Sequence, residues 1–224
     1  MNPEVTDYYN AIAPDYDLSR FGNTYGQFIQ EQEHSILQLL LEDQSLDKII
    51  DLGCGTGRFL NFAQFGVDIS EQMLEIAQSK FPTKSLFHEN ATHTHFPNQN
   101  FSCAFSFHVF MHLNPIIVQN FIDEAYRILK PGGKFIFDIP SKKRRRLVNY
   151  KTDGWHGAND FTIQEIKGMV NGKWEISFSR GILFLPIHRF PKTVRKAFVK
   201  LDTFLCRSFL KEYSSYLVFE LKKI

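Results

Sequence analysis

The chain has 224 residues, of which 43% are hydrophobic, and its formal net charge is +2. This length and apolar content favour one domain with a sizeable core, and so small a charge does not demand an acidic partner. No apolar run approaches the roughly 18 residues of a membrane span, and the first residues lack the basic and apolar regions of a secretory signal. Three widely spaced cysteines, Cys54, Cys103 and Cys206, are typical of reduced thiols in a cytoplasmic protein.

The N-terminal segment at 7–17 is aromatic and acidic, and Pro14 interrupts it. It is therefore a poor candidate for one long helix. Apolar residues recur at near-helical spacing over 25–42 and predict a helix there. A polar break at 43–47 separates this helix from a buried strand.

Three alternate glycines follow that strand, in the stretch Ile49-Ile50-Asp51-Leu52-Gly53-Cys54-Gly55-Thr56-Gly57. The pattern predicts a strand that feeds a tight turn and a helix N-terminus, where backbone N–H groups meet a ligand closely. Glycine permits positive φ and leaves no Cβ to hold a ligand away. The G-x-G-x-G spacing disfavours a dinucleotide fingerprint, and no G-K-[ST] follows to make a P-loop.

The string Asp-Leu-Gly-Cys-Gly-Thr-Gly at 51–57 resembles motif I of the class I S-adenosylmethionine (SAM)-dependent methyltransferases. The chain is most similar to the type 11 group, which resembles the ubiquinone and menaquinone biosynthesis methyltransferases. Gly-Val-Asp-Ile-Ser at 66–70 and Tyr-Arg-Ile-Leu-Lys-Pro-Gly-Gly-Lys at 126–134 match two further family signatures. The resemblance covers 7–140 well and the remainder loosely. It implies an α/β fold with a Rossmann-like, seven-stranded, mostly parallel sheet, helices on both faces and an antiparallel last strand.

The resemblance also implies a single SAM-dependent methyltransferase domain over 1–224. Its parts are N-terminal cofactor-covering helices at 1–45, a SAM-binding core at 46–140, and a substrate-side insertion with the C-terminal strands at 141–224. In the family a tyrosine of the N-terminal segment lies near the methionine moiety, which makes Tyr8 and Tyr16 candidates. An aromatic face attracts a sulfonium by the cation–π interaction. The alternative is that both tyrosines only anchor an N-terminal arm.

SAM is the cofactor that the resemblance implies. The resemblance implies cofactor contacts around the turn from Asp51, Gly53, Cys54, Gly55 and Gly57, and a contact between Asp68 and the ribose hydroxyls. It places Ile69, Met73, Asn90 and Ala91 around the adenine, and it places Ser106 and Phe107 beside the cofactor at the end of the fourth strand. Asn90 stands where the family usually has Asp, and its amide oxygen can accept the same hydrogen bond. Ile69 and Met73 are alternatively ordinary core residues.

The connection between the first two strands is unusually short. Asp68 comes 11 residues after Gly57 (68 − 57), where roughly 20 residues are usual. We therefore expect a shortened crossover of about two helical turns over 58–65. Ser70 and Asn114 are expected to cap the helices that follow them, and further strands are expected at 85–88, 101–107, 134–140, 174–184 and 213–224.

Five histidines lie between 88 and 112. His93, His95, His108 and His112 have a spacing that a metal site can use, but no Cys or carboxylate completes a recognised ligand motif, so no metal is predicted. His108 or His112 is alternatively a general base, because histidine titrates in the useful range. The remaining interpretation is that the histidines are surface or hydrogen-bonded residues, and no catalytic residue is assigned firmly.

Two basic segments stand out near the C-terminus. The run Lys142 to Arg146 suits phosphate, nucleic acid or anionic lipid, but a short cluster is also typical of a solvated helix start. We do not predict nucleic acid as the partner. The segment at 192–212 predicts a basic amphipathic helix, which either makes peripheral contact with a membrane or packs against the domain.

Together these patterns predict a cytoplasmic SAM-dependent methyltransferase that acts on an oxygen, nitrogen or carbon nucleophile of a small organic molecule. A dry pocket and enforced alignment supply much of such catalysis, so a dedicated base is not required. The alternatives are a nucleic-acid methyltransferase that uses the 142–146 run and a non-catalytic SAM-binding fold.

Overall fold

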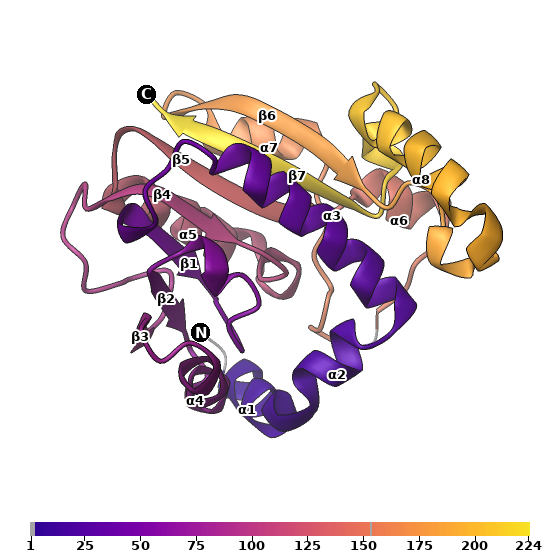
Figure 1. The fold of residues 1–224 in the computed structure, drawn as a ribbon. Helices are drawn as coiled ribbons and strands as arrows, with labels where there is room; N and C mark the ends of the chain where they lie inside the picture. Colours follow the sequence, from indigo (N-terminus) through magenta and orange to yellow (C-terminus); the bar gives the residue numbers. More distant parts are fainter. Residues whose placement is uncertain (1–2, 153) are drawn as a thin grey trace.

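The computed structural model describes residues 3–152 and 154–224. A seven-stranded sheet forms its centre, with strand order β3-β2-β1-β4-β5-β7-β6 (Figure 1). The strands are β1 (Ile49–Leu52), β2 (Phe65–Asp68), β3 (Ser85–His88), β4 (Phe101–Ser106), β5 (Leu129–Pro140), β6 (Trp174–Ile182) and β7 (Tyr216–Lys223). Strands β1 to β5 pair in parallel, whereas β7 runs antiparallel to both β5 and β6. The predicted fold class is confirmed.

Helices cover both faces of this sheet (Figure 1). In chain order, the helices of the described residues are α1 (Pro3–Ile12), α2 (Tyr16–Phe21), α3 (Thr24–Leu40), α4 (Glu71–Lys80), α5 (Pro115–Ile128), α6 (Lys142–Leu147), α7 (Ile163–Val170) and α8 (Lys192–Arg207). Alternation along β5 divides the core, because successive strand residues point to opposite faces. Phe135 and Phe137 join the α5 and α7 side, and Ile136 joins the α3 side.

The connection after the glycine turn contains no α-helix. A single 3-10 turn, η3 (Leu60–Phe62), is all that forms between β1 and β2, so the expected helix N-terminus behind the turn was wrong. Only seven residues, 58–64, join Gly57 to β2, and after the chain has turned at both ends too few remain for α-helical turns. Buried Phe59, Leu60 and Ala63 cover the sheet where a crossover helix would lie.

Other boundaries follow local chemistry. Ser70 and Asn114 accept hydrogen bonds from the backbone of Met73 and Ile117, which confirms the two predicted helix starts. Helix α8 ends at Arg207 rather than at 212. The Ser208 hydroxyl donates to the Leu205 carbonyl and accepts from the backbone N–H of Leu210, which closes the helix early. In the described part of the chain no helix has the length and apolar content to cross a bilayer.

Candidate active site

The glycine turn leaves bare backbone beside a cleft. Gly53 has φ of 83° and Gly55 has φ of 51°, in the left-handed region that favours glycine. A Cβ on Gly53 would lie 2.5 Å from the Cγ2 of Val109, whereas a Cβ on Gly55 would meet nothing within 4 Å. Both glycines line the cleft, so the open space at Gly55 is space available to a ligand.

Asp68 ends β2 and holds the turn in place. Its Oδ2 accepts a hydrogen bond from the backbone N–H of Gly55 at 2.8 Å, and its Oδ1 accepts one from Ser70 at 2.9 Å. Burial raises the pKa of Asp68, although these two backbone donors oppose the shift. The carboxylate lines the cleft, where its remaining lone pairs can accept from a ligand.

The cleft encloses about 670 Å³, part of it open to solvent. Its walls come from the carboxyl ends of neighbouring parallel strands, where open α/β sheets bind ligands. The N-terminal helices close it with the side chains of Val5, Tyr9 and Tyr16. Burial raises the pKa of both tyrosines, so their hydroxyls stay neutral. Both tyrosines line the cleft.

A recess at one end of the cleft contains Asp51. This recess shares Tyr16, Gly53 and Phe107 with the main cleft. Asp51 is 3% exposed, and none of the described residues forms a hydrogen bond with its carboxylate. Burial raises its pKa well above the ordinary value, against the effect of Arg58. A buried carboxylate without a partner is costly, so the recess favours a cationic ligand group.

A second cavity of about 540 Å³ adjoins the cleft. Tyr9, Tyr16, His108 and His112 line both spaces. Beyond them the cavity is mainly aromatic, and Arg20 reaches into its lining with hydrogen bonds to the hydroxyl of Tyr8 at 3.0 Å and to the ring of His156 at 3.3 Å. No carboxylate of the described residues forms an ion pair with Arg20.

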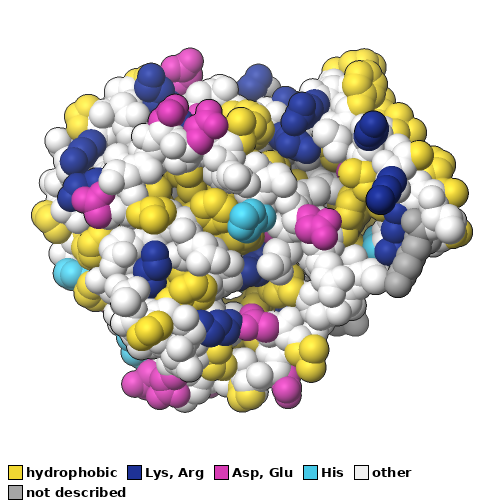
Figure 2. Space-filling model, viewed as in Figure 1, with side chains coloured by type: hydrophobic (Ala, Val, Ile, Leu, Met, Phe, Trp, Pro, Cys, Tyr) yellow, Lys and Arg dark blue, Asp and Glu magenta, His cyan; other side chains and the backbone are white. Residues whose placement is uncertain are grey.

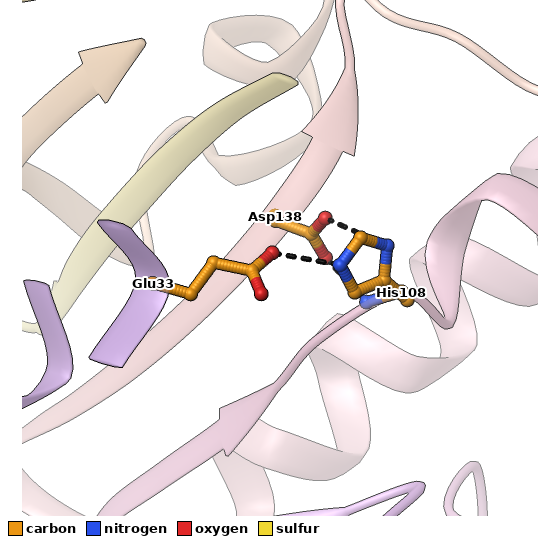
Figure 3. Close-up of side chains that lie close together, drawn as sticks. All are labelled: Glu33, His108 and Asp138. Atoms are coloured by element: carbon orange, nitrogen blue, oxygen red, sulfur yellow. Dashed lines mark hydrogen bonds and ion pairs between the residues drawn. The ribbon is translucent and has the colours of Figure 1, made fainter. Parts of the chain in front are cut away.

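His108 belongs to a buried charge cluster at the junction (Figure 3). Its Nε2 lies 2.7 Å from Oε1 of Glu33, and its Nδ1 lies 3.7 Å from Oδ2 of Asp138. Arg58 binds the other oxygen of Glu33 at 2.8 Å. Burial raises the pKa of Glu33, but Arg58 and His108 outweigh it and hold the pKa below its ordinary value. Burial lowers the pKa of His108, but the two carboxylates outweigh it and raise the pKa.

The same three residues offer a geometry that a cation can use. Ligand atoms of Glu33, His108 and Asp138 lie within 4.8 Å of one another, and no other such group occurs in residues 3–152 and 154–224. Protonated His108 together with Arg58 already balances the two carboxylates. The cluster is therefore explained by internal ion pairs.

His112 has the opposite electrostatics. Burial and the neighbouring histidines lower its pKa to about 3, so the ring is neutral at physiological pH. The backbone N–H of Gly157 donates to its Nδ1 at 3.0 Å. In the neutral ring the proton therefore lies on Nε2, for which the described residues provide no hydrogen-bond partner. His112 presents a donor, rather than a base, to the two cavities.

Comparisons with known proteins agree with this geometry. A family model described as "Methyltransferase domain" matches residues 50–137. Uncharacterized protein MJ1252 of Methanocaldococcus jannaschii is 28% identical over 98% of this chain and 91% of its own length. Demethylmenaquinone methyltransferase of Symbiobacterium thermophilum is 31% identical, over 65% of this chain and 62% of that enzyme. Magnesium protoporphyrin IX methyltransferase from Synechocystis PCC 6803, solved with SAM, has the same fold, with a TM-score of 0.68 at 15% identity over 99% of this chain and 96% of that one.

Residues 50–137 form the methyltransferase domain of a SAM-dependent enzyme with the class I fold.

Most of the residues predicted to contact the cofactor come together in this methyltransferase. The main cleft is lined by Tyr16, Gly53, Gly55, Asp68, Ile69, Met73, Ala91 and Phe107, and the recess by Asp51 and Cys54. The cofactor contacts of these residues stay predictions.

Four of the predicted residues do not line the cleft or the recess. Tyr8 packs against Trp155, and the oxygen of Asn90 accepts from Thr92. Ser106 is buried and donates to the carbonyl of Leu52. A Cβ on Gly57 would meet Leu60 and Phe81, so this glycine serves the turn itself.

Among the cleft-lining residues that sequence reasoning missed, Tyr9 and Glu89 are the two with polar side chains. Tyr9 is next to Tyr8 on α1, and only the rotation of that helix decides which ring faces the cofactor side. Glu89 precedes Asn90, and its carboxylate binds His95, which lies six residues ahead.

The 142–146 run of the methyltransferase is largely engaged by its own chain. Lys142 pairs with Glu165, and Lys143 pairs with Glu212. The guanidinium of Arg145 donates to the carbonyls of Gly157 and Asn159. The run begins α6, as the solvated-helix interpretation predicts, and little of its charge is left for nucleic acid.

Proposed function

We propose that the methyltransferase binds SAM in the cleft and transfers its methyl group to a small organic acceptor held in the second cavity. The observation that carries this proposal is the pairing of the open Gly55 backbone with the Asp68 carboxylate on one wall of the cleft. An adenosine ribose fits there, because Asp68 retains acceptor capacity for two hydroxyls. The partnerless Asp51 suits the ammonium group of the methionine moiety.

Bound SAM supplies an electrophilic methyl group on a sulfonium. The chain's own residues then position the acceptor and exclude water. Tyr9 and Tyr16 lie between the two cavities, and their neutral rings offer faces to a cation. Enforced alignment of the two reactants in a dry site supplies most of the rate enhancement.

The acceptor is proposed to present an anionic or strongly accepting oxygen. Nε2–H of His112 donates toward it, and Arg20 at the cavity lining adds a cation with no carboxylate partner among the described residues. His108 is already directed at Glu33, so it acts on the charge of the site rather than as a free base. The alternative to this proposal is a base role for His108 or His112, which stays a prediction that the pH profile of kcat tests.

Titration calorimetry with SAM tests the cofactor, and the absence of binding at high micromolar concentration overturns the proposal. The acceptor is sought by methyl transfer from radiolabelled SAM to panels of phenols, quinone precursors, amines and sugars. The similarity to demethylmenaquinone methyltransferase makes quinone precursors the first choice among these panels. A protein that binds SAM but methylates nothing across these panels would instead be a non-catalytic SAM-binding fold.

The proposal treats 1–224 as one domain that works in the cytoplasm, which suits its three free, buried cysteines. The proposal assigns peripheral membrane contact to α8, because exposed apolar and basic side chains lie together on this helix.

A further inference from the structure

Helix α8 is turned so that its polar side faces the protein. Asp202 is fully buried and accepts hydrogen bonds from the backbone N–H of Leu185 at 2.7 Å and from Gln32 at 3.2 Å. Cys206, one turn later, is also fully buried. A helix at a protein surface ordinarily buries its apolar stripe, but in this orientation several large apolar residues of α8 are exposed. Of these, Phe198 packs against Phe190 with ring centroids 4.7 Å apart.

These apolar residues form an outward stripe. Val194, Phe198 and Leu201 are 41%, 37% and 45% exposed, and Phe204 is 68% exposed. Phe209, just beyond the end of the helix, is 91% exposed. Their positions repeat at i, i+4, i+7 and i+10, which places the four helical residues on one face. Over the region of α8, Figure 2 shows hydrophobic side chains next to Lys and Arg.

The charge around this stripe indicates what kind of partner binds it. Lys196, Lys200 and Arg207 are exposed on one flank and form no ion pair with any described residue. The one acid between 192 and 211 is Asp202, which is buried on the opposite side. Pairing two copies of the chain through this face would bring their basic flanks together. An anionic bilayer instead offers opposite charge to the flank and hydrocarbon to the stripe.

We propose that α8 docks the protein on an anionic lipid surface, with Phe198, Leu201, Phe204 and Phe209 inserted among the acyl chains. The inference deepens the proposed membrane contact and does not depend on methyl transfer. The segment that leads into α8 lies next to the second cavity, because His188 in η5 (Ile187–Arg189) packs against Tyr25 with ring centroids 4.7 Å apart. Tyr25 lines that cavity.

Flotation of the full chain with vesicles tests the proposal. We expect binding to phosphatidylglycerol/phosphatidylcholine vesicles at low salt, and much weaker binding to pure phosphatidylcholine. Phe204→Ser with Phe209→Ser should lower the partition coefficient by roughly tenfold per side chain. Lys196→Gln with Lys200→Gln should lower it by about fivefold per charge and remove much of its salt dependence.

Ile116→Ser on α5 is the matched control, because Ile116 is 75% exposed but lies outside this surface, and this variant should float like the wild type. Equal flotation of the phenylalanine variant and the wild type would overturn the proposal, as would failure of the wild type to bind anionic vesicles. Sedimentation velocity that shows a dimer dissolved by Phe204→Ser would assign the face to a second copy instead. SAM titration on the same preparations keeps the tests separate, since loss of vesicle binding with intact SAM binding refutes only the docking.

Discussion

Gly55 offers the sharpest test of the cofactor cleft, through replacement by alanine. The Cβ introduced by Gly55→Ala meets nothing within 4 Å, so the protein can accommodate it without repacking. Its methyl group would, however, occupy the side of the turn that faces the ligand. We therefore expect a variant that folds but binds SAM poorly.

The two effects differ in size. Alanine at positive φ costs about 1–2 kcal/mol, which is a fall in Tm of roughly 2–8 °C in a chain of this length. Gly53→Ala carries the same backbone cost and adds overpacking of about 1–3 kcal/mol, because its Cβ would lie 2.5 Å from Val109. Holding the ligand off the Gly55 backbone forfeits contacts worth about 1–3 kcal/mol, or roughly tenfold or more in Kd.

Gly132→Ala is the control for backbone strain. Gly132 has φ of 76°, its Cβ also meets nothing within 4 Å, and it lies in the turn within β5 rather than in the cleft. Thermal unfolding should show similar losses for Gly55→Ala and Gly132→Ala and a larger loss for Gly53→Ala. Titration calorimetry should show weakened SAM binding for Gly55→Ala and wild-type binding for Gly132→Ala. Wild-type SAM affinity in Gly55→Ala would refute the placement of the cofactor on this turn.

The other predictions concern the charged groups of the site. Asp68→Ala should weaken SAM binding by roughly 100-fold, since two hydrogen bonds to a charged group are lost, and an unchanged Kd by calorimetry would contradict the placement of the ribose at Asp68. Glu33→Gln should lower the free energy of unfolding by about 3–5 kcal/mol in urea titrations, because two buried cations lose their carboxylate, and a loss below about 1 kcal/mol would contradict the ion pairs. Because the pKa of His108 is raised in the fold, the Glu33–His108 pair stabilises at pH below the ordinary histidine value, and the stability should fall as pH rises through the raised pKa. In Glu33→Gln that fall should be smaller, because only Asp138 of the two carboxylates then raises the pKa. The pKa of His112 is lowered to about 3, so as pH falls below 6.5 the unfolded chain binds a proton that the folded chain does not. Urea titrations should therefore show that the free energy of unfolding falls by up to about 1.4 kcal/mol per pH unit, and His112→Asn should remove this fall. SAM binding should release protons, because a cation near Asp51 lowers the raised pKa of that carboxyl, and calorimetry in buffers of different ionisation enthalpy would disprove this by giving identical heats.

The fold could be predicted because its signals are local. The capping residues Ser70 and Asn114 act within a few residues, and each begins the expected helix; the glycines after β1 likewise make the expected tight turn, although no helix follows it. The crossover after Gly57 could not be predicted with the same rules. Its phenylalanines resemble a helical pattern, but too few residues separate the strands for a helix to form.

The site was predictable where a residue's backbone position determines its role, as for Asp68. It was not predictable where a side chain chooses between partners. Asn90 uses its oxygen in a local turn with Thr92, a competition that Asx residues commonly enter. The contact between Glu33 and His108 joins positions 75 residues apart, and nothing in either local sequence indicates the partner.

The charge balance of the site connects its stability to its ligand. Asp51 and Asp138 are buried and Asp68 is half-buried, and desolvation raises the pKa of each, so in the absence of a cation these groups reduce the stability of the fold. Arg58 and His108 compensate mainly for Glu33 and Asp138. The Asp51 end of the cleft therefore keeps an unbalanced carboxylate, and a ligand with an ammonium and a sulfonium supplies the missing positive charge. A ligand that binds only the folded state adds RT ln(1 + [L]/Kd) to the free energy of unfolding. The same buried carboxyl groups that destabilise the protein without a ligand therefore favour the binding of a cationic cofactor.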